Sequence, residues 1–293
     1  MLSKRTIRQI YICIIIILVS VLLYSIPRSE GFEDVGEIGF IVTRCVRNVE
    51  QNTLYRECYK AIRKFHPDLK IIFIDDNSNK DVLKEYEMEN VEIIQSEYPA
   101  TGEYLPYWYL LQRKMFKKAI IIQDSMILNT AIPYQDVNDY KFIFEFTPDR
   151  NEMDEVNALI NSTSIPNELR MLYYSNKWVG CFGSTMVITS DFLQKVEEKV
   201  EISRWSKIVN TRKMRMGLER GIALACIYTG GSMSNNSLFG NIYDTQTIKD
   251  TELAGKHSLE MYLKDKTRIK DPIIKIWNGR SYLLSIDGRY ILY

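Results

Sequence analysis

Four short runs of apolar residues constrain the fold of this chain more than any other feature of its sequence. The runs are IGFIVT (38–43), KIIFI (70–74), VEIIQ (91–95) and AIIIQ (119–123). Each run is almost continuously apolar, which is typical of a parallel strand that is buried on both faces of its sheet. The sequence therefore predicts four neighbouring strands in the interior of one sheet.

Helical patterns separate some of these runs. Five apolar residues between Leu54 and Phe65 recur at the spacing of one helix face, and Pro67 predicts that this helix ends before it. A second, aromatic-rich helix is predicted over residues 105–116, entered through Gly102. Strands that alternate with helices indicate a doubly wound α/β sheet, in which ligands bind at the carboxyl ends of the strands.

The second half of the chain is less regular, and no internal repeat or second linker divides it from the first. We therefore expect a single mixed, mostly parallel α/β domain over residues 38–293. Its further predicted elements are strands at 140–146 and 184–189, helices at 191–200 and 211–228, and a last apolar run at 272–277.

Residues 10–26 form an uncharged apolar segment that would span about 25 Å as a helix. Lys4, Arg5 and Arg8 precede it, so the positive-inside rule predicts a cytosolic tail (1–9), a transmembrane signal-anchor (10–26) and a stem (27–37). This topology predicts a single-pass membrane protein whose C-terminal domain is lumenal or extracytoplasmic. The alternative is a cleaved signal peptide, although the apolar run exceeds the usual length of one.

Composition excludes several classes of function. The 38 basic and 37 acidic residues leave a net charge of +1, which argues against a protein that binds nucleic acid. Only two histidines are present, so a multi-histidine metal centre is excluded, and no P-loop, Rossmann glycine motif, nucleophile elbow or zincin motif occurs. The cysteines beyond the apolar segment are compatible with two disulfides or with four buried thiols: Cys45, Cys58, Cys181 and Cys226.

Acidic residues follow two of the predicted strands at the point where each strand ends. The second run ends in Asp75-Asp76-Asn77-Ser78, and the fourth ends in Gln123-Asp124-Ser125. Taken alone, either segment reads as a turn with a helix cap. Both acidic ends follow parallel strands of one sheet, however, so both are expected to face the same crevice.

The pair IIFIDDNSN and AIIIQDSM, some 45 residues apart, resembles the nucleotide-sugar-binding half of GT-A glycosyltransferases. The resemblance covers residues 38–128 and extends more loosely through 178–193. It implies a nucleotide-diphosphate sugar as donor substrate and a divalent cation, Mn²⁺ or Mg²⁺, bound through Asp124. The donor contacts that it implies are Thr43, Asp75, Asp76, Asp124 and Ser125.

One position departs from the D-x-D motif of that family. If Asp124-Ser125-Met126 is aligned with the motif, a methionine takes the place of the second acid, and a thioether does not suit Mg²⁺ or Mn²⁺. One carboxylate, water and the donor's own diphosphate still suffice to hold a cation, and His257 is a candidate second ligand. Alternatively, Lys275 and Arg280 neutralise the leaving diphosphate, or they are ordinary surface charges.

Glu219 is the candidate general base for an inverting transfer, since such a reaction needs a carboxylate that accepts the proton of the acceptor hydroxyl. It lies in MGLERGIALA between Gly217 and Gly221, which would allow a substrate to approach the backbone closely. The alternative is an ordinary exposed glutamate on a helix. Asp191 and Asp149 are weaker candidates for the same role.

These observations predict a membrane-anchored enzyme that transfers a sugar to a hydroxyl of a glycan, protein or lipid acceptor. A non-catalytic, membrane-tethered nucleotide-sugar-binding protein is the first alternative, because the D-x-D motif is incomplete. A nucleotidyltransferase is the second, but that class requires a glycine-rich loop after the first strand, and TRCVRNVEQN contains no glycine.

Overall fold

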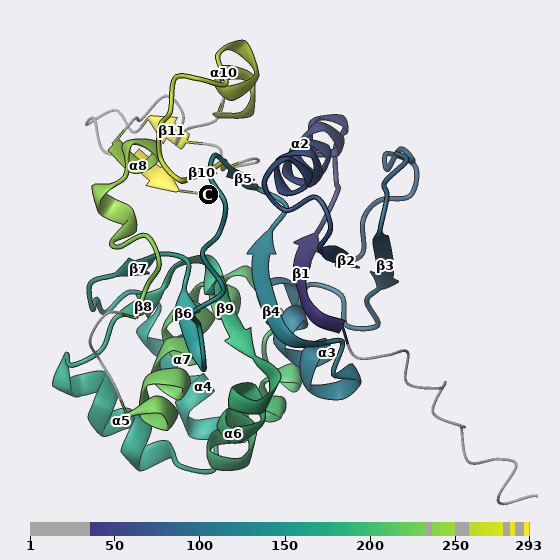
Figure 1. Cartoon of the computed structure of the whole chain (residues 1–293). Helices are drawn as coiled ribbons and strands as arrows, with labels where there is room; N and C mark the ends of the chain where they lie inside the picture. The colour runs from purple at the N-terminus through teal and green to yellow at the C-terminus, as the bar shows by residue number, and fades with distance from the viewer. Residues whose placement is uncertain (1–35, 232–235, 250–257, 278–281, 285–289, 293) are drawn as a thin grey trace, which may run out of the picture. The chain divides into compact units, whose positions relative to one another are not determined.

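A six-stranded sheet with the order β3-β2-β1-β4-β9-β6 forms the centre of the molecule (Figure 1). The computed structural model describes residues 36–231, 236–249, 258–277, 282–284 and 290–292. Strands β1 to β4 are parallel, and β9 runs antiparallel to both β4 and β6, which confirms the predicted mixed, mostly parallel α/β architecture. The strands of this sheet are β1 (Gly36–Arg44), β2 (Lys70–Asp75), β3 (Val91–Gln95), β4 (Phe116–Gln123), β6 (Tyr140–Phe142) and β9 (Met186–Thr189).

Alternate residues of the central strands enter two different hydrophobic clusters. In β1, Phe40 and Val42 pack on one face of the sheet and Ile41 packs on the other, and all three are fully buried. Burial of a side chain of this size contributes about 1.5–3 kcal/mol to folding. The continuous apolar runs in the sequence thus reflect helices on both faces: α2 covers one, and α3, α6 and α7 cover the other (Figure 1).

Local sequence signals set most of the helix ends. Asn48 and Gln51 form a capping box at the start of α2, which ends at Phe65, before Pro67, as predicted. Helix α3 ends at Arg113 because Lys114 adopts a left-handed conformation with φ of 45°, so the prediction to residue 116 was too long. The helices are α2 (Val49–Phe65), α3 (Leu105–Arg113), α4 (Met153–Ser162), α5 (Pro166–Ser175), α6 (Ser190–Val200), α7 (Arg212–Gly230), α8 (Gln246–Lys249) and α10 (Ser258–Lys264).

One predicted strand and one alternative interpretation differ from the structure, which also contains two helices that were not predicted. The strand predicted at 140–146 is divided into β6 and β7 (Glu145–Phe146), and β7 pairs with β8 (Gly180–Cys181) rather than with the central sheet. Residues 76–90 connect β2 to β3 through turns without a helix. Helices α4 and α5 were not predicted.

The last part of the chain returns to the middle of the fold. Strand β10 (Ile273–Lys275) pairs antiparallel with β5 (Met126–Leu128), which follows β4 directly. A separate hairpin joins β11 (Tyr282–Leu284) to β12 (Tyr290–Leu292). The chain therefore carries residues near its end to the carboxyl edge of the central sheet.

Residues 36–293 form one compact unit, and β1 includes the last two residues of the predicted stem. The predicted tail and anchor (1–26), together with most of the stem, lie outside the described residues. Among the residues that are described, none of the helices has both the length and the apolar character needed to cross a bilayer. All four cysteines of this unit are free thiols, so the two-disulfide alternative is wrong for this structure: Cys45, Cys58, Cys181 and Cys226.

Candidate active site

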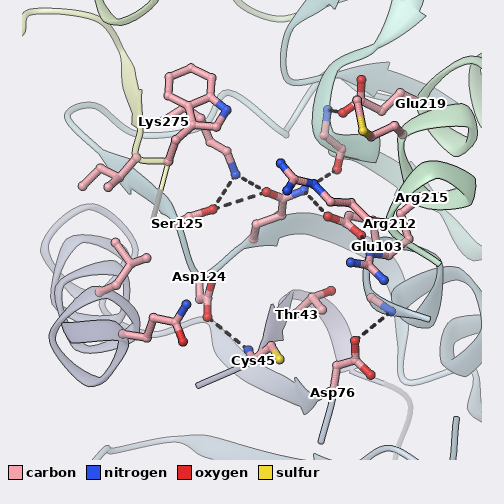
Figure 2. Close-up of a pocket in the computed structure, with 18 of the residues that line it drawn as sticks. Thr43, Cys45, Asp76, Glu103, Asp124, Ser125, Arg212, Arg215, Glu219 and Lys275 are labelled. Carbon is pink, nitrogen blue, oxygen red and sulfur yellow. Dashed lines mark hydrogen bonds and ion pairs between the residues drawn. The ribbon is translucent and has the colours of Figure 1, made fainter. Parts of the chain in front are cut away.

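A cavity of about 330 Å³ opens at the carboxyl ends of β1, β2 and β4, where the parallel sheet predicts a ligand site (Figure 2). Thr43, at the end of β1, contributes to its floor. Charges of both signs surround this space. The carboxylates and cations lining it are Asp76, Glu103, Asp124 and Glu219, and Arg47, Arg212, Arg215 and Lys275.

The two neighbouring acids after β2 have different environments. Asp75 is 1% exposed and forms an ion pair with Arg44 (Nη2 to Oδ2, 2.5 Å), while its other oxygen accepts a hydrogen bond from the backbone N–H of Ser78. Asp76 lines the cavity, and its carboxylate accepts hydrogen bonds from the backbone N–H groups of Ala100 (2.7 Å) and Gly102 (3.1 Å). Asp75 thus stabilises the fold, and Asp76 is the acid placed to meet a ligand.

Burial raises the pKa of Asp76 above its ordinary value, and the hydrogen bonds from Ala100 and Gly102 oppose this shift. The loop around this carboxylate is unusually tight, because both Ala100 (φ 66°) and Gly102 (φ 50°) have left-handed backbone conformations. The loop therefore holds Asp76 at the cavity with one oxygen bonded to each N–H group.

The turn between β4 and β5 presents three polar side chains, Gln123, Asp124 and Ser125, to the cavity. The N–H of Asp124 donates to the carbonyl oxygen of Thr43 (3.0 Å), so the β1–β4 hydrogen-bond ladder continues into the turn. The carboxylate of Asp124 accepts a hydrogen bond from the N–H of Cys45 (3.3 Å). Burial raises the pKa of Asp124 to about 6, although Cys45, Lys275 and Arg44 each oppose the shift.

Met126 does not belong to the site. It is the first residue of β5, is fully buried and packs in the hydrophobic cluster beneath α2. The third position of the Asp124-Ser125-Met126 alignment therefore contributes no side chain to the cavity. The side chains that flank Asp124 at the cavity are Gln123 and Ser125.

Lys275 reaches this turn from β10, as the second half of the chain folds back onto β5. It pairs in register with Met126, and the next residue, Ile276, donates its N–H to the carbonyl oxygen of Ser125 (2.8 Å). The Lys275 ammonium donates hydrogen bonds to Oε1 of Gln123 and to Oγ of Ser125 (Figure 2). With 9% of the residue exposed, this cation is largely buried at the edge of the cavity.

Glu219 lies across the cavity from Lys275, on the first half of α7 (Figure 2). Its Oε1 accepts a hydrogen bond from the N–H of Gly183 (3.0 Å), and a quarter of its side chain is exposed. Burial raises the pKa of Glu219 to about 7, against the attraction of the neighbouring Arg220. A carboxylate with this pKa can accept a proton at neutral pH and release it again.

Gln123 connects the two sides of the site. Lysine is only a donor, so Gln123 turns its amide oxygen to Lys275, and its NH₂ group then donates to the carbonyl oxygen of Gly183 (2.9 Å). Gly183 in turn donates its N–H to Glu219. A continuous set of hydrogen bonds thus runs from Lys275 through Gln123 and Gly183 to Glu219.

The two weaker candidates for the base lie outside this cavity. Asp149 forms a two-pronged ion pair with Arg220, with both N···O distances at 2.7 Å. Asp191 is an exposed residue in the first turn of α6. Of the acids proposed for this role, only Glu219 is in the site.

Two further predicted site residues, His257 and Arg280, lie outside the described residues. Several residues that line the cavity were not predicted from the sequence, chiefly Gln123, Arg212 and Arg215. The arginines had a readable signal, because residues 212, 215 and 219 lie on one face of a helix. No sequence signal pointed to Gln123, because its role depends on contact with Lys275, which lies 152 residues away in the sequence.

The described residues do not form a divalent-cation site by themselves, without water or the donor's diphosphate as further ligands. They contain no cluster of three or more His, Cys, Asp or Glu side chains that could bind one. At the β4–β5 turn, a single carboxylate is accompanied by an amide, a hydroxyl and the positively charged ammonium of Lys275. Mg²⁺ and Mn²⁺ prefer anionic oxygen ligands, and an ammonium in the same place repels them.

Sequence comparison matches no protein-family model and no curated protein. Among solved structures, the galactosyltransferase LgtC, crystallised with donor and acceptor sugar analogues, has 10% identity and a TM-score of 0.41, over 85% of this chain and 90% of that chain. The Mn/GDP form of core-mannan synthase A from Aspergillus fumigatus has 12% identity and a TM-score of 0.38, over 68% and 71% of the two chains. The mannosyltransferase Ktr4p from S. cerevisiae has 10% identity and a TM-score of 0.37, over 68% and 67%. These superpositions are too loose to transfer an activity or a residue's role to this chain.

Proposed function

We propose that this chain is a glycosyltransferase that moves a sugar from a nucleotide-diphosphate sugar to the hydroxyl group of an acceptor. The observation that supports this most strongly is the pairing of two groups in one cavity. Lys275 provides a fixed cation on one side, and Glu219 provides a carboxylate with a pKa of about 7 on the other. A transfer of this kind requires both a stabilised leaving group and a base.

On the donor side, the bond between the anomeric carbon and the diphosphate oxygen breaks, and the oxygen leaves with the electron pair. Positive charge that is already in place near that oxygen stabilises the transition state. Lys275, Arg212 and Arg215 line the cavity and supply such charge. Thr43 and Asp76 are the groups that we assign to the nucleoside, in line with the family resemblance of the sequence.

On the acceptor side, the unprotonated carboxylate of Glu219 accepts the proton of the acceptor hydroxyl. The hydroxyl oxygen then forms its bond to the anomeric carbon on the face opposite to the leaving diphosphate, so the configuration at that carbon is inverted. The hydrogen bond from Gly183 holds Oε1 of Glu219, and Oε2, which lies 3.9 Å from Nη1 of Arg220, is the oxygen that we assign to the proton. Proton transfer of this type typically contributes about 10²–10⁴-fold to the rate.

The predicted anchor at residues 10–26 would place this reaction at a membrane, with the enzyme domain on the lumenal or extracytoplasmic side. The acceptor would then be a glycan, a protein or a lipid on that side. This assignment depends on the apolar segment and its basic flank alone.

A non-catalytic nucleotide-sugar-binding protein is the second candidate. It is favoured by one observation, namely that Met126 stands where the family motif has its second acid and is buried in the core rather than in the cavity. Such a protein would bind the donor without consuming it.

Incubation of the full chain with a panel of nucleotide-diphosphate sugars and simple glycoside acceptors separates these candidates. We expect release of a nucleoside diphosphate together with a glycosylated acceptor, detected by mass spectrometry. Asp191→Asn, which alters an exposed acid outside the cavity, is the matched control and should keep full activity. Binding of a nucleotide sugar without any turnover would support the binding protein, and absence of both would reject the proposal.

A further inference from the structure

The position of the Lys275 ammonium is fixed by the strand that carries it. Strand β10 holds it in register with β5 through Ile273 and Ile274, both of which are fully buried in the cluster beneath α2. The hydrogen bond from the N–H of Ile276 to the carbonyl oxygen of Ser125 continues this pairing past Lys275. A backbone pairing with buried side chains thus determines where the ammonium lies.

The groups around this ammonium suit an N–H donor that carries one positive charge, but they do not suit a metal ion. Gln123 and Ser125 offer neutral oxygen atoms, which accept hydrogen bonds from an N–H donor. Asp124, between them in the sequence, lines the same cavity and interacts electrostatically with Lys275. Asp124 thus places a negative charge near the ammonium, whose hydrogen-bond acceptors Gln123 and Ser125 are neutral.

The positive charge of Lys275 lies where the proposed reaction needs one. It lies at the carboxyl edge of parallel strands, beside Asp124 and at the wall of the cavity. In the proposed reaction the diphosphate of the donor binds at this edge, where a divalent cation would otherwise neutralise it. A buried ammonium does the same by direct hydrogen bonds to phosphate oxygens.

We propose that Lys275 takes the place of a divalent cation, so that this site binds and activates the donor's diphosphate without metal. The proposal rests on the proposed function for the identity of the donor. Gln123 and Ser125 are then positioning residues, which orient the ammonium rather than contact the substrate.

The test is calorimetric titration of UDP and of GDP into the full chain, first in excess EDTA and then in Mn²⁺. We expect binding of at least one nucleoside diphosphate in EDTA, with an affinity that Mn²⁺ changes by less than threefold. Lys275→Met keeps the length of the side chain but removes its charge, and we expect its affinity to fall about 10- to 100-fold. Lys275→Arg, which retains the charge, should recover part of the loss.

Lys270→Met is the matched control. Lys270 is an exposed lysine of the same C-terminal segment and lines a different cavity, so this variant should bind as the wild type does. Circular dichroism establishes that each variant is folded, and the wild-type comparison of EDTA with Mn²⁺ needs no variant.

The outcomes separate the two proposals. Binding by the wild type only in Mn²⁺, or full affinity of a folded Lys275→Met, would overturn the role of Lys275 and leave the proposed function standing. Binding in EDTA that depends on Lys275, without turnover of any nucleotide sugar, would reject the enzyme and retain the metal-free site. No binding of either nucleotide under either condition would overturn both.

Discussion

At the scale of single residues, two adjacent aspartates illustrate how the structure assigns roles. Asp75 and Asp76 follow the same strand, but their side chains point in different directions, as consecutive residues of extended chain do. Asp75 neutralises the buried guanidinium of Arg44, and Asp76 faces the cavity. An aspartate therefore stabilises the fold at position 75, and the next aspartate lines the cavity at position 76.

Replacement of each aspartate by asparagine should separate these roles. Asp75→Asn leaves Arg44, which is 4% exposed, without its anionic partner, and we expect a loss of about 3–5 kcal/mol in the free energy of unfolding. Asp76→Asn removes a charge that burial already disfavours, so its stability should change by less than about 1 kcal/mol. Urea unfolding measures the first effect, and titration with UDP or GDP should show weaker binding only for Asp76→Asn. Equal destabilisation by both substitutions would contradict this division.

Glu219 should set the pH dependence of transfer. The base is active when it is unprotonated, and its pKa is raised to about 7, so the rate should rise with pH and level off above about 7. Glu219→Gln keeps an oxygen for the Gly183 N–H but cannot accept a proton, and turnover should fall about 10²–10⁴-fold. Steady-state kinetics from pH 5.5 to 9 provide the measurement, with Asp191→Asn as control. Turnover of Glu219→Gln within threefold of the wild type would remove Glu219 from the mechanism.

At the scale of elements, the glycines of α7 serve packing rather than substrate access. A Cβ at Gly217 would lie 2.9 Å from the Cβ of Glu155, and a Cβ at Gly221 would lie 2.9 Å from Cδ1 of Leu159. Both contacts are with α4, so the expectation that these glycines admit a substrate is wrong. They allow α4 and α7 to approach closely, which determines the position of Glu219.

The two glycines should respond differently to replacement by alanine. At Gly221 the new methyl group meets the far end of the Leu159 side chain, which can adjust more easily than a backbone, and the better helix propensity of alanine, worth up to about 1 kcal/mol, offsets the crowding. At Gly217 it meets a Cβ next to the backbone of α4, and we expect a loss of about 1–3 kcal/mol. Thermal unfolding of the two variants tests this order, and the opposite order would show that α4 moves more easily than the packing indicates.

The sequence predicted elements well wherever the signal was local. The strands of the parallel half and the helices at 191–200 and 211–228 appear within a few residues of their predicted ends, because apolar periodicity and caps are properties of short segments. Part of the cavity lining followed from the same kind of signal, since Asp76 and Asp124 were named from strand ends, whereas Glu219 was named as the acid that an inverting transfer requires. Strand β5 and the contact of Lys275 with Gln123 depend on pairing across some 150 residues, and nothing local encodes such pairing.

At the scale of the whole molecule, the acids of the cavity make stability depend on pH. In the unfolded chain a carboxyl group loses its proton near pH 4, whereas Asp124 keeps its proton to about pH 6 and Glu219 to about pH 7. These two groups therefore bind more protons in the folded state than in the unfolded state over this range, and their contribution to the free energy of unfolding falls as pH rises from 4 to 7. Burial lowers the pKa of His66, which acts in the opposite direction below pH 6.5.

We expect the ligand-free chain to be more stable at pH 5.5 than at pH 8, by on the order of 1 kcal/mol or more. Urea unfolding of the wild type across this range measures the slope, and the double variant Asp124→Asn/Glu219→Gln should have a flatter one. A wild-type stability that rises steadily from pH 5.5 to 8 would show that these two acids are ionised throughout in the folded state.

The return of β10 to β5 also has a consequence for the order of events during synthesis. The ribosome completes Gln123 and Ser125 about 150 residues before Lys275, which corresponds to roughly 8–30 s of elongation. During that interval the parallel strands are already available to pair, yet the proposed diphosphate site still lacks the ammonium of Lys275. The nascent chain thus cannot acquire the complete site until its C-terminal segment has emerged and docked, which delays any capture of donor to the end of folding.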